Sequence, residues 1–390
     1  MRTPLAWLNL VHNKPRTAVA IAGITFSVIL IFMQLGFHGA VGKTATMVFE
    51  GLDFDIAIRS PEYLFLTNAG TIPLDRLHQA LTVNGVETAR PFYVSIHVWL
   101  TPQGDQARSI LCLAMRPEEN VFSQPEIREQ RLKLTRPNSV LIDRLTRRDF
   151  GPKNGKRFSD DDIDNETENE PAPEIGYQRV SIVGHFALGT GLASDGAVVM
   201  SERSFQQVFG SKFEENITAA LIKVEEGQDP QAVAIRLRDA LPRDADVMTR
   251  DQVKSFEYNH WVYEKTIGVL FQLGVAMAIV VGVAIVYQVL SSDVESQLAQ
   301  YATLKAIGYG NEFLAKIVLR QSVLLAGLGF IPGFAISQVL YIIIGSVAYI
   351  PIEMSIGRVA LVFLLTLIMC TASGMGALLK VRSADPADLF

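Results

Sequence analysis

The triplet Gly42-Lys43-Thr44 is the first stretch whose spacing could do chemistry, because it ends the phosphate-binding pattern G-x-x-x-x-G-K-[ST]. That pattern also needs a glycine at position 37, which is Phe37 in this chain. A phosphate-binding loop follows a buried strand and opens a helix, whereas this triplet follows the uncharged run 17–37. We therefore interpret it as the small-residue end of a membrane helix and expect no nucleotide to bind there.

Acidic residues gather in segment 159–170, "SDDDIDNETENE", and could ligate calcium. Asp160, Asp162 and Asp164 alternate as in an EF-hand loop, which next requires a glycine and, at its twelfth position, a glutamate. Asn165 and Pro171 occupy those two places. The favoured interpretation is a solvated loop rather than a metal site.

The remaining reactive residue types form no catalytic pattern. The six histidines are scattered without an H-E-x-x-H motif, and Ser194 lacks the G-x-S-x-G context because position 192 is Leu192. Cys112 and Cys370 have no metal-type spacing and are not expected to pair. We expect no catalytic, metal-binding or cofactor-binding residues, and a net charge of −5 gives no indication of nucleic-acid binding.

Four charge-free apolar runs dominate the 390-residue chain, in which 49% of residues are hydrophobic and only 19% are charged. The runs are residues 17–37, 266–290, 321–352 and 359–379, and each exceeds the roughly 20 residues that cross a bilayer. None of these runs holds Asp, Glu, Lys, Arg or His, which argues against ion-driven transport. Pro332 is expected to kink the third span. The predicted spans are residues 17–38, 263–290, 317–352 and 359–380.

Basic residues flank the predicted spans unevenly, which indicates their orientation by the positive-inside rule. We predict that both termini and loop 291–316 lie in the cytoplasm. The termini are residues 1–16, which include an interfacial helix, and the tail 381–390. Segments 39–262 and 353–358 are then periplasmic, and the chain is a multi-pass protein of the inner (plasma) membrane. The basic residues that carry this prediction are Arg2, Lys14, Arg16, Lys305, Lys316, Lys380 and Arg382.

The long segment 39–262 predicts a mixed α+β domain inserted between the first and second spans. The fold class is therefore a four-helix membrane protein with a large α+β periplasmic domain. Alternating or short apolar runs predict strands at 93–100, 109–115, 139–143, 178–186, 196–200 and 219–224. Helices are predicted at 74–82, 201–209 and 230–241, the latter two with Ser201 and Asp229 as N-caps.

The two ends of this domain predict a helical stalk. Residues 39–52 continue the first span without a proline, and 249–265 show helical spacing of apolar residues leading into the second span. Both spans are therefore expected to extend outward as continuous helices, with Phe256, Trp261 and Tyr263 as stalk residues. The alternative is an ordinary juxtamembrane helix with an aromatic belt.

Loop 291–316 contains a short amphipathic pattern that ends at Gly308. Such a helix can dock into a groove of a soluble partner or lie on the bilayer surface, and the spacing alone leaves both interpretations open. The apolar positions at three- and four-residue spacing are Val294, Leu298, Tyr301, Leu304 and Ile307.

The same loop resembles a known family. "YATLKAIGYG", residues 301–310, is similar to the E-I-G-x-L-K/R-A-x-G signature of permeases related to MacB and FtsX (type VII). Leu304, Lys305, Ala306 and Gly308 match that signature, whereas Gln300, Tyr301 and Ala302 depart from it. The start "PLAWLNLVHNKPRTAVAIAGITFSVILIFMQLGF" and the tail "VRSADPADLF" resemble the DevC subgroup.

This resemblance implies a non-catalytic permease subunit of an ABC exporter that acts as a homodimer. A separate DevA-like or MacB-like ATPase binds the ATP, and its closure moves the coupling helix and, through the stalk, the periplasmic domain (mechanotransmission). A DevB-like periplasmic adaptor and a TolC-like outer-membrane duct then export glycolipid or other envelope material. The residues implied in ATPase coupling are Val294, Leu298, Tyr301, Leu304, Lys305, Ala306 and Gly308.

Two alternative functions use the same architecture. One is an FtsX-like signalling permease that controls a periplasmic hydrolase, and the other is LolC/LolE-like lipoprotein release. In each case the partners are proteins and membrane lipids, with no nucleic acid.

Overall fold

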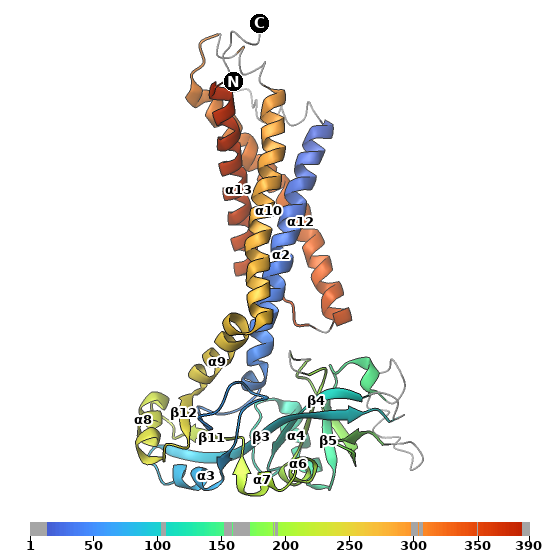
Figure 1. Cartoon of the computed structure of the whole chain (residues 1–390), viewed down its shortest axis with the longest axis vertical. Coiled ribbons are helices and arrows are strands. Elements are labelled where there is room, and N and C mark those ends of the chain that lie inside the picture. Colours follow the sequence, from blue (N-terminus) through green and yellow to red (C-terminus); the bar gives the residue numbers. More distant parts are fainter. Residues whose placement is uncertain are drawn as a thin grey trace. The chain divides into compact units, whose positions relative to one another are not determined.

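A computed structural model describes residues 14–102, 107–151, 158, 172–189, 191, 194–297, 303, 307–348 and 350–383 (Figure 1). The chain forms two compact units. The helical unit holds Thr266–Ala348 with the residues up to Ala40 and those from Ile352 on, and the sheet domain is essentially Val41–Lys265. Helix α2 contributes to both units.

Among its described residues, the helical unit contains four helices that are long and apolar enough to cross a membrane, by length and composition. Each overlaps one predicted span, and Pro332 lies inside the third without ending it. Glycines allow close packing within this unit, because a Cβ on Gly329 or Gly333 would lie 2.5 Å or 2.7 Å from side-chain atoms of the first helix. The four are α2 (Lys14–Glu50), α10 (Thr266–Ser296), α12 (Asn311–Ala348) and α13 (Ile356–Ser383).

The sheet domain is built on one mixed sheet, in which ten strands are found among the described residues. Its main order is β12-β1-β11-β3-β4-β9-β5-β8, with parallel pairs β4–β9 and β5–β8, and β6 and β7 attached at the side through β3. The strands are β1 (Ile56–Arg59), β3 (Val86–Leu100), β4 (Ala107–Met115), β5 (Ser139–Asp143), β6 (Glu174–Ile175), β7 (Gln178–Arg179), β8 (Ser181–Phe186), β9 (Ala197–Ser201), β11 (Ala219–Val224) and β12 (Asp246–Thr249). The short strands β2 (Ile72–Pro73) and β10 (Asn216–Ile217) pair separately.

Both faces of this sheet are covered by apolar side chains. Successive residues of a strand point to opposite faces, and in β4 Ile110 and Cys112 enter one buried cluster while Leu111 and Leu113 enter another. Helices and short turns supply the remaining cover (Figure 1). Besides the end of α2, the helices and turns described in this domain are α3 (Asp75–Ala80), α4 (Pro125–Gln130), η1 (Arg131–Thr135), η2 (Arg148–Phe150), α6 (Glu202–Phe209), α7 (Lys212–Glu215), α8 (Pro230–Ala240), α9 (Arg250–Asn259) and η3 (His260–Glu264).

The strands and helices expected from the sequence of this domain are confirmed. Every predicted strand overlaps an observed one, and 74–82, 201–209 and 230–241 contain α3, α6 and α8. The predicted N-caps are also present, because Ser201 Oγ accepts from the Ser204 N–H at 3.3 Å and Asp229 accepts from the N–H of Gln231 at 3.1 Å. The mixed α/β character of the domain was therefore readable from residue patterns.

The expectation of one continuous helix over 249–265 leading into the second span is wrong. Helix α9 ends at Asn259, the π-helical turn η3 follows, and Lys265 is extended with ψ 141° before α10 begins at Thr266. The Lys265 N–H donates to the His260 carbonyl, five residues back, at 2.9 Å. The regular α-helical pattern, in which each N–H donates to the carbonyl four residues back, is therefore broken. By contrast, α2 is unbroken as far as Glu50.

Candidate functional site at the stalk junction

Two helix ends meet in the sheet domain at what we call the stalk junction, residues 41–68 with 246–265. Residues 41–50 of α2 lead into the sheet domain, and α9 leads out of it. A capping box fixes the start of α9, because Thr249 Oγ1 accepts from the Gln252 N–H at 3.4 Å while Gln252 Oε1 accepts from the Thr249 N–H at 3.0 Å. The direction of α9 is thus set at the edge strand β12.

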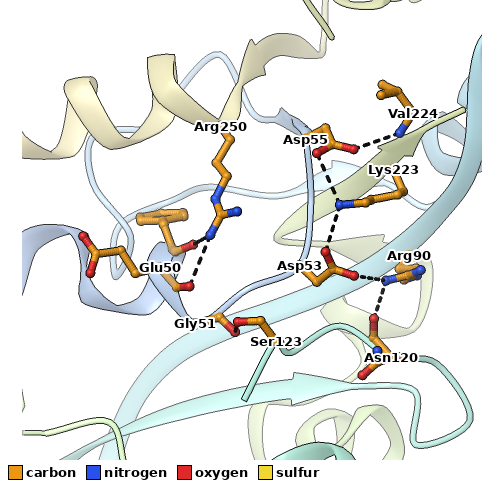
Figure 2. A network of polar contacts seen from close by, with 11 residues as sticks. Glu50, Gly51, Asp53, Asp55, Arg90, Asn120, Ser123, Lys223, Val224 and Arg250 are labelled. Carbon is orange, nitrogen blue, oxygen red and sulfur yellow. Dashed lines mark hydrogen bonds and ion pairs between the residues drawn. The ribbon is translucent and has the colours of Figure 1, made fainter. Parts of the chain in front are cut away.

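Arg250 joins the two helix ends. Its Nη2 atom donates to the carbonyl oxygens of Phe49 and Glu50, both at 3.2 Å (Figure 2). The Arg250 backbone N–H donates to the Asp55 carbonyl at 2.8 Å. The last carbonyls of a helix lack intrahelical partners and carry the negative end of its dipole, so a guanidinium is the matching group. One side chain from the first turn of α9 therefore caps the C-terminus of α2.

Charged side chains anchor the segment that follows α2 to the centre of the sheet. Lys223 Nζ of β11 lies 2.9 Å from Asp53 and 3.3 Å from Asp55, and Arg90 of β3 lies 3.6 Å from Asp53 (Figure 2). Burial acts to raise the pKa of Asp53, but Lys223 and Arg90 outweigh it and lower that pKa below its ordinary value. Asp53 is thus held ionised between two cations. The end of α2 is fastened to both β3 and β11.

The inner face of α9 carries an acid that is fully buried. Glu257 is 0% exposed, its Oε1 accepts a hydrogen bond from the Tyr63 hydroxyl, and its Oε2 has no hydrogen-bond partner within the described ranges. A cavity of about 40 Å³, lined mainly by apolar residues such as Met47 and Leu111, lies beside it. Burial raises the pKa of Glu257 to about 7, although hydrogen bonding from Tyr63 and other polar neighbours opposes that shift.

Arg59 fixes the same face of α9 from strand β1. Its guanidinium carbon lies 4.2 Å from the ring centre of Tyr63 and 4.3 Å from that of Phe256, so it is held between two aromatic faces. Its Nη2 atom pairs with Asp246 of β12 at 3.2 Å. This arrangement joins α9, β1 and β12 around one buried cation.

The glycines of the sequence "GAVGKT" serve packing. Residues 39–44 lie inside α2, and a Cβ on Gly42 would stand 2.3 Å from the ring of Tyr258 on α9. Within the helical unit, a Cβ on Gly39 would stand 2.2 Å from Arg358 Nη2. Small residues are therefore required where side chains cross α2 closely, and the triplet stands in a helix interior rather than in a strand-to-helix loop.

The structure places the predicted stalk residues around this junction. Phe256 packs edge-on against Tyr63 with 5.9 Å between ring centres, and Trp261 packs likewise against Phe65 at 5.5 Å. Tyr263 is 56% exposed, and its ring packs edge-on against that of Tyr258 with 6.2 Å between ring centres.

Only two of the predicted coupling residues fall in the part of the chain that the structure describes. Val294 is buried at the end of α10, and Gly308 has φ 106°, in the left-handed region that favours glycine. The predicted residues Leu298, Tyr301, Leu304, Lys305 and Ala306, and the acidic segment 159–170, lie outside the described residues.

Sequence reasoning missed Arg250, Glu257 and Arg59. Glu257 lies in an amphipathic stretch where an acid is normally solvated, and no local pattern shows that Tyr63 lies opposite it. Arg250 lies within the Thr-x-x-Gln capping pattern 249–252, which could have located the start of α9 but not the partner of the Arg250 side chain. Among the described residues, no group of three or more His, Cys, Asp or Glu side chains could hold a metal ion.

Comparison with solved structures gives only remote likenesses. The extracellular domain of the ABC-type transporter YknZ from Gram-positive bacteria is 13% identical, with 50% of this chain and 100% of that chain covered and a TM-score of 0.32. The periplasmic region of MacB from Actinobacillus actinomycetemcomitans is 9% identical, with 51% and 90% covered and a TM-score of 0.28. Such values are too low to establish a shared fold.

Sequence comparison is informative for the C-terminal part. None of the curated proteins compared with this chain matches it. Residues 273–386, which include α12, α13 and most of α10, match the FtsX-like permease C-terminal family. The part of the chain that follows the sheet domain is therefore similar in sequence to FtsX-like permeases, and this match supports that family for the chain.

Proposed function

We propose that this chain is the permease subunit of an ABC exporter and converts ATP hydrolysis by a separate ATPase into movement of the sheet domain. The observation that carries the proposal is the pair of hydrogen bonds from the Arg250 side chain to the carbonyls of Phe49 and Glu50, because they join the end of α2 to the start of α9. The FtsX-like match over residues 273–386 and the four apolar helices support the same conclusion.

Helix α2 is the stiff lever in this mechanism. Its 37 residues form one helix of about 55 Å at 1.5 Å per residue, so an axial displacement at one end reaches the other. The route through α9 differs, because the π-helical turn and the extended Lys265 let the chain bend before α10. We therefore assign force transmission to α2 and a hinge to residues 260–265.

The proposed assembly follows from the resemblance of the loop and the chain ends to the DevC subgroup. Two copies of the chain act with two copies of a DevA-like or MacB-like ATPase, which dock on helix 294–307. Both termini and this loop are cytoplasmic, whereas the sheet domain, inserted between the first two spans of this inner-membrane protein, is periplasmic. It acts there on a DevB-like adaptor and a TolC-like duct to export glycolipid or other envelope material.

Reconstitution with the ATPase tests the proposal. Charged substitutions Leu304→Asp and Ala306→Asp should abolish the stimulation of ATPase activity by the permease while the unfolding temperature of the chain stays unchanged. Ser296→Asp is the matched control, because position 296 falls off the apolar stripe of the predicted helix and should retain stimulation. Full stimulation by both loop variants contradicts the docking role.

An FtsX-like signalling permease is the second candidate, because the match over residues 273–386 is to the FtsX-like permease C-terminal family, which is compatible with either function. It would use the same lever to control a periplasmic hydrolase, and a LolC/LolE-like permease would use it to release lipoproteins. Capture of partners by the full-length chain with its ATPase separates these functions: an adaptor supports export, whereas a hydrolase or a lipoprotein carrier supports an alternative.

A further inference from the structure

A cavity of about 430 Å³ lies within the sheet domain, at one end of the neighbouring strands β4, β9 and β5. Strands β4 and β9 are parallel, so the residues that follow each of them leave the sheet side by side. Strand β5 runs antiparallel to β9, so the residues that precede β5 reach the same end. The cavity is therefore lined by residues of three segments, 116–118, 134–137 and 201–207.

Three arginines line this cavity, and neighbouring acids hold the first of them in place. Arg116 Nε donates to Glu202 at 2.8 Å, and its Nη1 atom lies 3.6 Å from Glu119. The second carboxylate oxygen of Glu202 accepts a hydrogen bond from the Tyr93 hydroxyl. Both oxygens of Glu202 thus have partners within the protein, so this acid does not require a cation from outside.

The other two arginines of the cavity, Arg136 and Arg203, are exposed and have no such partners. Neither makes a side-chain hydrogen bond or an ion pair with any residue that the structure describes. Elsewhere on the domain, Arg144 and Arg147 pair with carboxylates at 2.8 Å and 3.2 Å. Glu118 is the exposed acid of the lining. Two unpaired guanidinium groups against one exposed carboxylate leave the cavity with an excess of positive charge.

The chemistry of the lining favours a phosphate group that carries a polar organic part. A guanidinium matches phosphate through two parallel N–H···O bonds, and a phosphate monoester carries about −1.5 to −2 charges at pH 7, which suits two unpaired arginines. The buried Leu134 and Pro117 supply apolar contact, whereas the exposed Thr135 and Gln207 offer hydrogen-bonding groups. The volume falls in the range of roughly 300–1,000 Å³ that is typical of small-molecule sites.

We propose that this cavity binds a phosphate monoester, with Arg136 and Arg203 on the phosphate. The phosphate belongs either to a soluble ester or to the headgroup of a lipid, since both carry the same group. The proposal concerns the sheet domain alone and does not depend on an ATPase, an adaptor or export.

Isothermal titration calorimetry of the full-length chain in a neutral detergent tests the proposal with glycerol 3-phosphate as the probe. Arg136→Gln combined with Arg203→Gln should weaken binding at least tenfold without changing the unfolding temperature, because neither side chain has a partner to lose. Arg243→Gln is the matched control, since this exposed arginine lies outside the cavity, and it should bind as the wild type does. Absence of binding to the wild type, or equal binding by the double variant and the control, overturns the proposal.

Glu118→Gln tests the electrostatic reasoning in the opposite direction. It removes a like charge from the lining, so glycerol 3-phosphate should bind several-fold more tightly. Salt screens exposed charges, so this gain should shrink as the ionic strength rises. An affinity that does not change at low salt contradicts the proposal.

Three further ligands identify the group that is recognised. Glycerol lacks the phosphate and should not bind. Dihexanoyl phosphatidic acid carries the same phosphate on a short-chain lipid: tighter binding than that of glycerol 3-phosphate supports a lipid headgroup, and weaker binding supports a soluble ester. Binding of hexaglutamate without binding of either phosphate ligand overturns the proposal, because an acidic protein segment then occupies the cavity.

Hydrogen exchange locates the bound probe without any substitution. Saturation with glycerol 3-phosphate should slow the exchange of backbone amides in 134–136 and 202–207 several-fold. The amides of α8 are the internal control and should not change. Protection that appears only outside the three lining segments overturns the assignment of this cavity.

Discussion

Ionisation of Glu257 should set how firmly α9 is held against the sheet domain. Burial raises the pKa of this acid from 4.5 to about 7 in the folded protein, so the folded state binds its proton more tightly than the unfolded state does. Because the shift is upward for an acid, its stabilising effect is complete below about pH 4.5 and is lost as the pH rises toward 7. Each pKa unit corresponds to about 1.4 kcal/mol, so the loss is about 3 kcal/mol.

Substitution Glu257→Gln isolates this effect. Glutamine keeps the shape and can still accept the hydrogen bond from Tyr63, but it does not ionise. At pH 8 the variant should hold α9 more firmly than the wild type by about 3 kcal/mol, and at pH 4.5 the two should be nearly equal. Tyr63 and Arg59 both interact with Glu257, and burial raises the pKa of Tyr63 well above its ordinary value, so Tyr63 stays protonated in this range.

Hydrogen exchange of the α9 amides measures the difference directly in the full-length chain. Comparison of variant and wild type at one pH cancels the chemical exchange rate, and 3 kcal/mol corresponds to a change of roughly a hundredfold in local opening. Asp251→Asn is the matched control, because this acid lies on the exposed side of the same helix and its loss should produce no such pH dependence. If the ratio of the α9 amide exchange rates of the variant and the wild type is the same at pH 5 and pH 8, the reasoning is refuted.

Three further substitutions test other contacts. Arg250→Gln should speed exchange at the end of α2 and destabilise the sheet domain by about 2 kcal/mol, since it removes two charge-assisted hydrogen bonds to the helix terminus, whereas the same change at the solvent-exposed Arg243 should be near neutral. Gly42→Val should lower the thermal midpoint, because overpacking against the neighbouring tyrosine costs roughly 1–3 kcal/mol, while Gly327→Ala, with open space at its Cβ, should not. Asp229→Ala should cost about 1 kcal/mol in chemical unfolding through loss of the α8 cap, and no change there would contradict the capping role.

The sheet domain was largely predictable because its strands carry their burial in local patterns. Segment 93–100 alternates apolar and other residues, and it lies within β3, which pairs with β11 over one half and β4 over the other. The short apolar runs 139–143 and 196–200 predicted strands, and the observed strands β5 and β9 are buried at every position. The strand order was not predictable, since β9 lies between β4 and β5 through pairings that no local pattern encodes.

The stalk junction was predictable only in part, because its decisive contacts join distant segments. Helical spacing at 249–265 located α9 correctly but could not show the break at Lys265, where aromatic contacts between Phe65 and the π-helical turn compete with regular helix. Pairing of Glu257 with Tyr63 spans 194 residues of sequence. An acid at a helical surface position is ordinarily solvated, so burial of this one is a property of the tertiary fold.

The two connections of the sheet domain therefore have different mechanical properties in the proposed mechanism. Helix α2 reaches the sheet without interruption, and its end is held by Arg250, Lys223 and Arg90, so a push along it is delivered to β3 and β11. The second connection bends at 260–265, so α9 follows the sheet rather than driving it. Protonation of Glu257 changes only how strongly α9 is held against the sheet domain. A change in external pH should therefore change the packing of α9, while the contacts that hold the end of α2 stay the same.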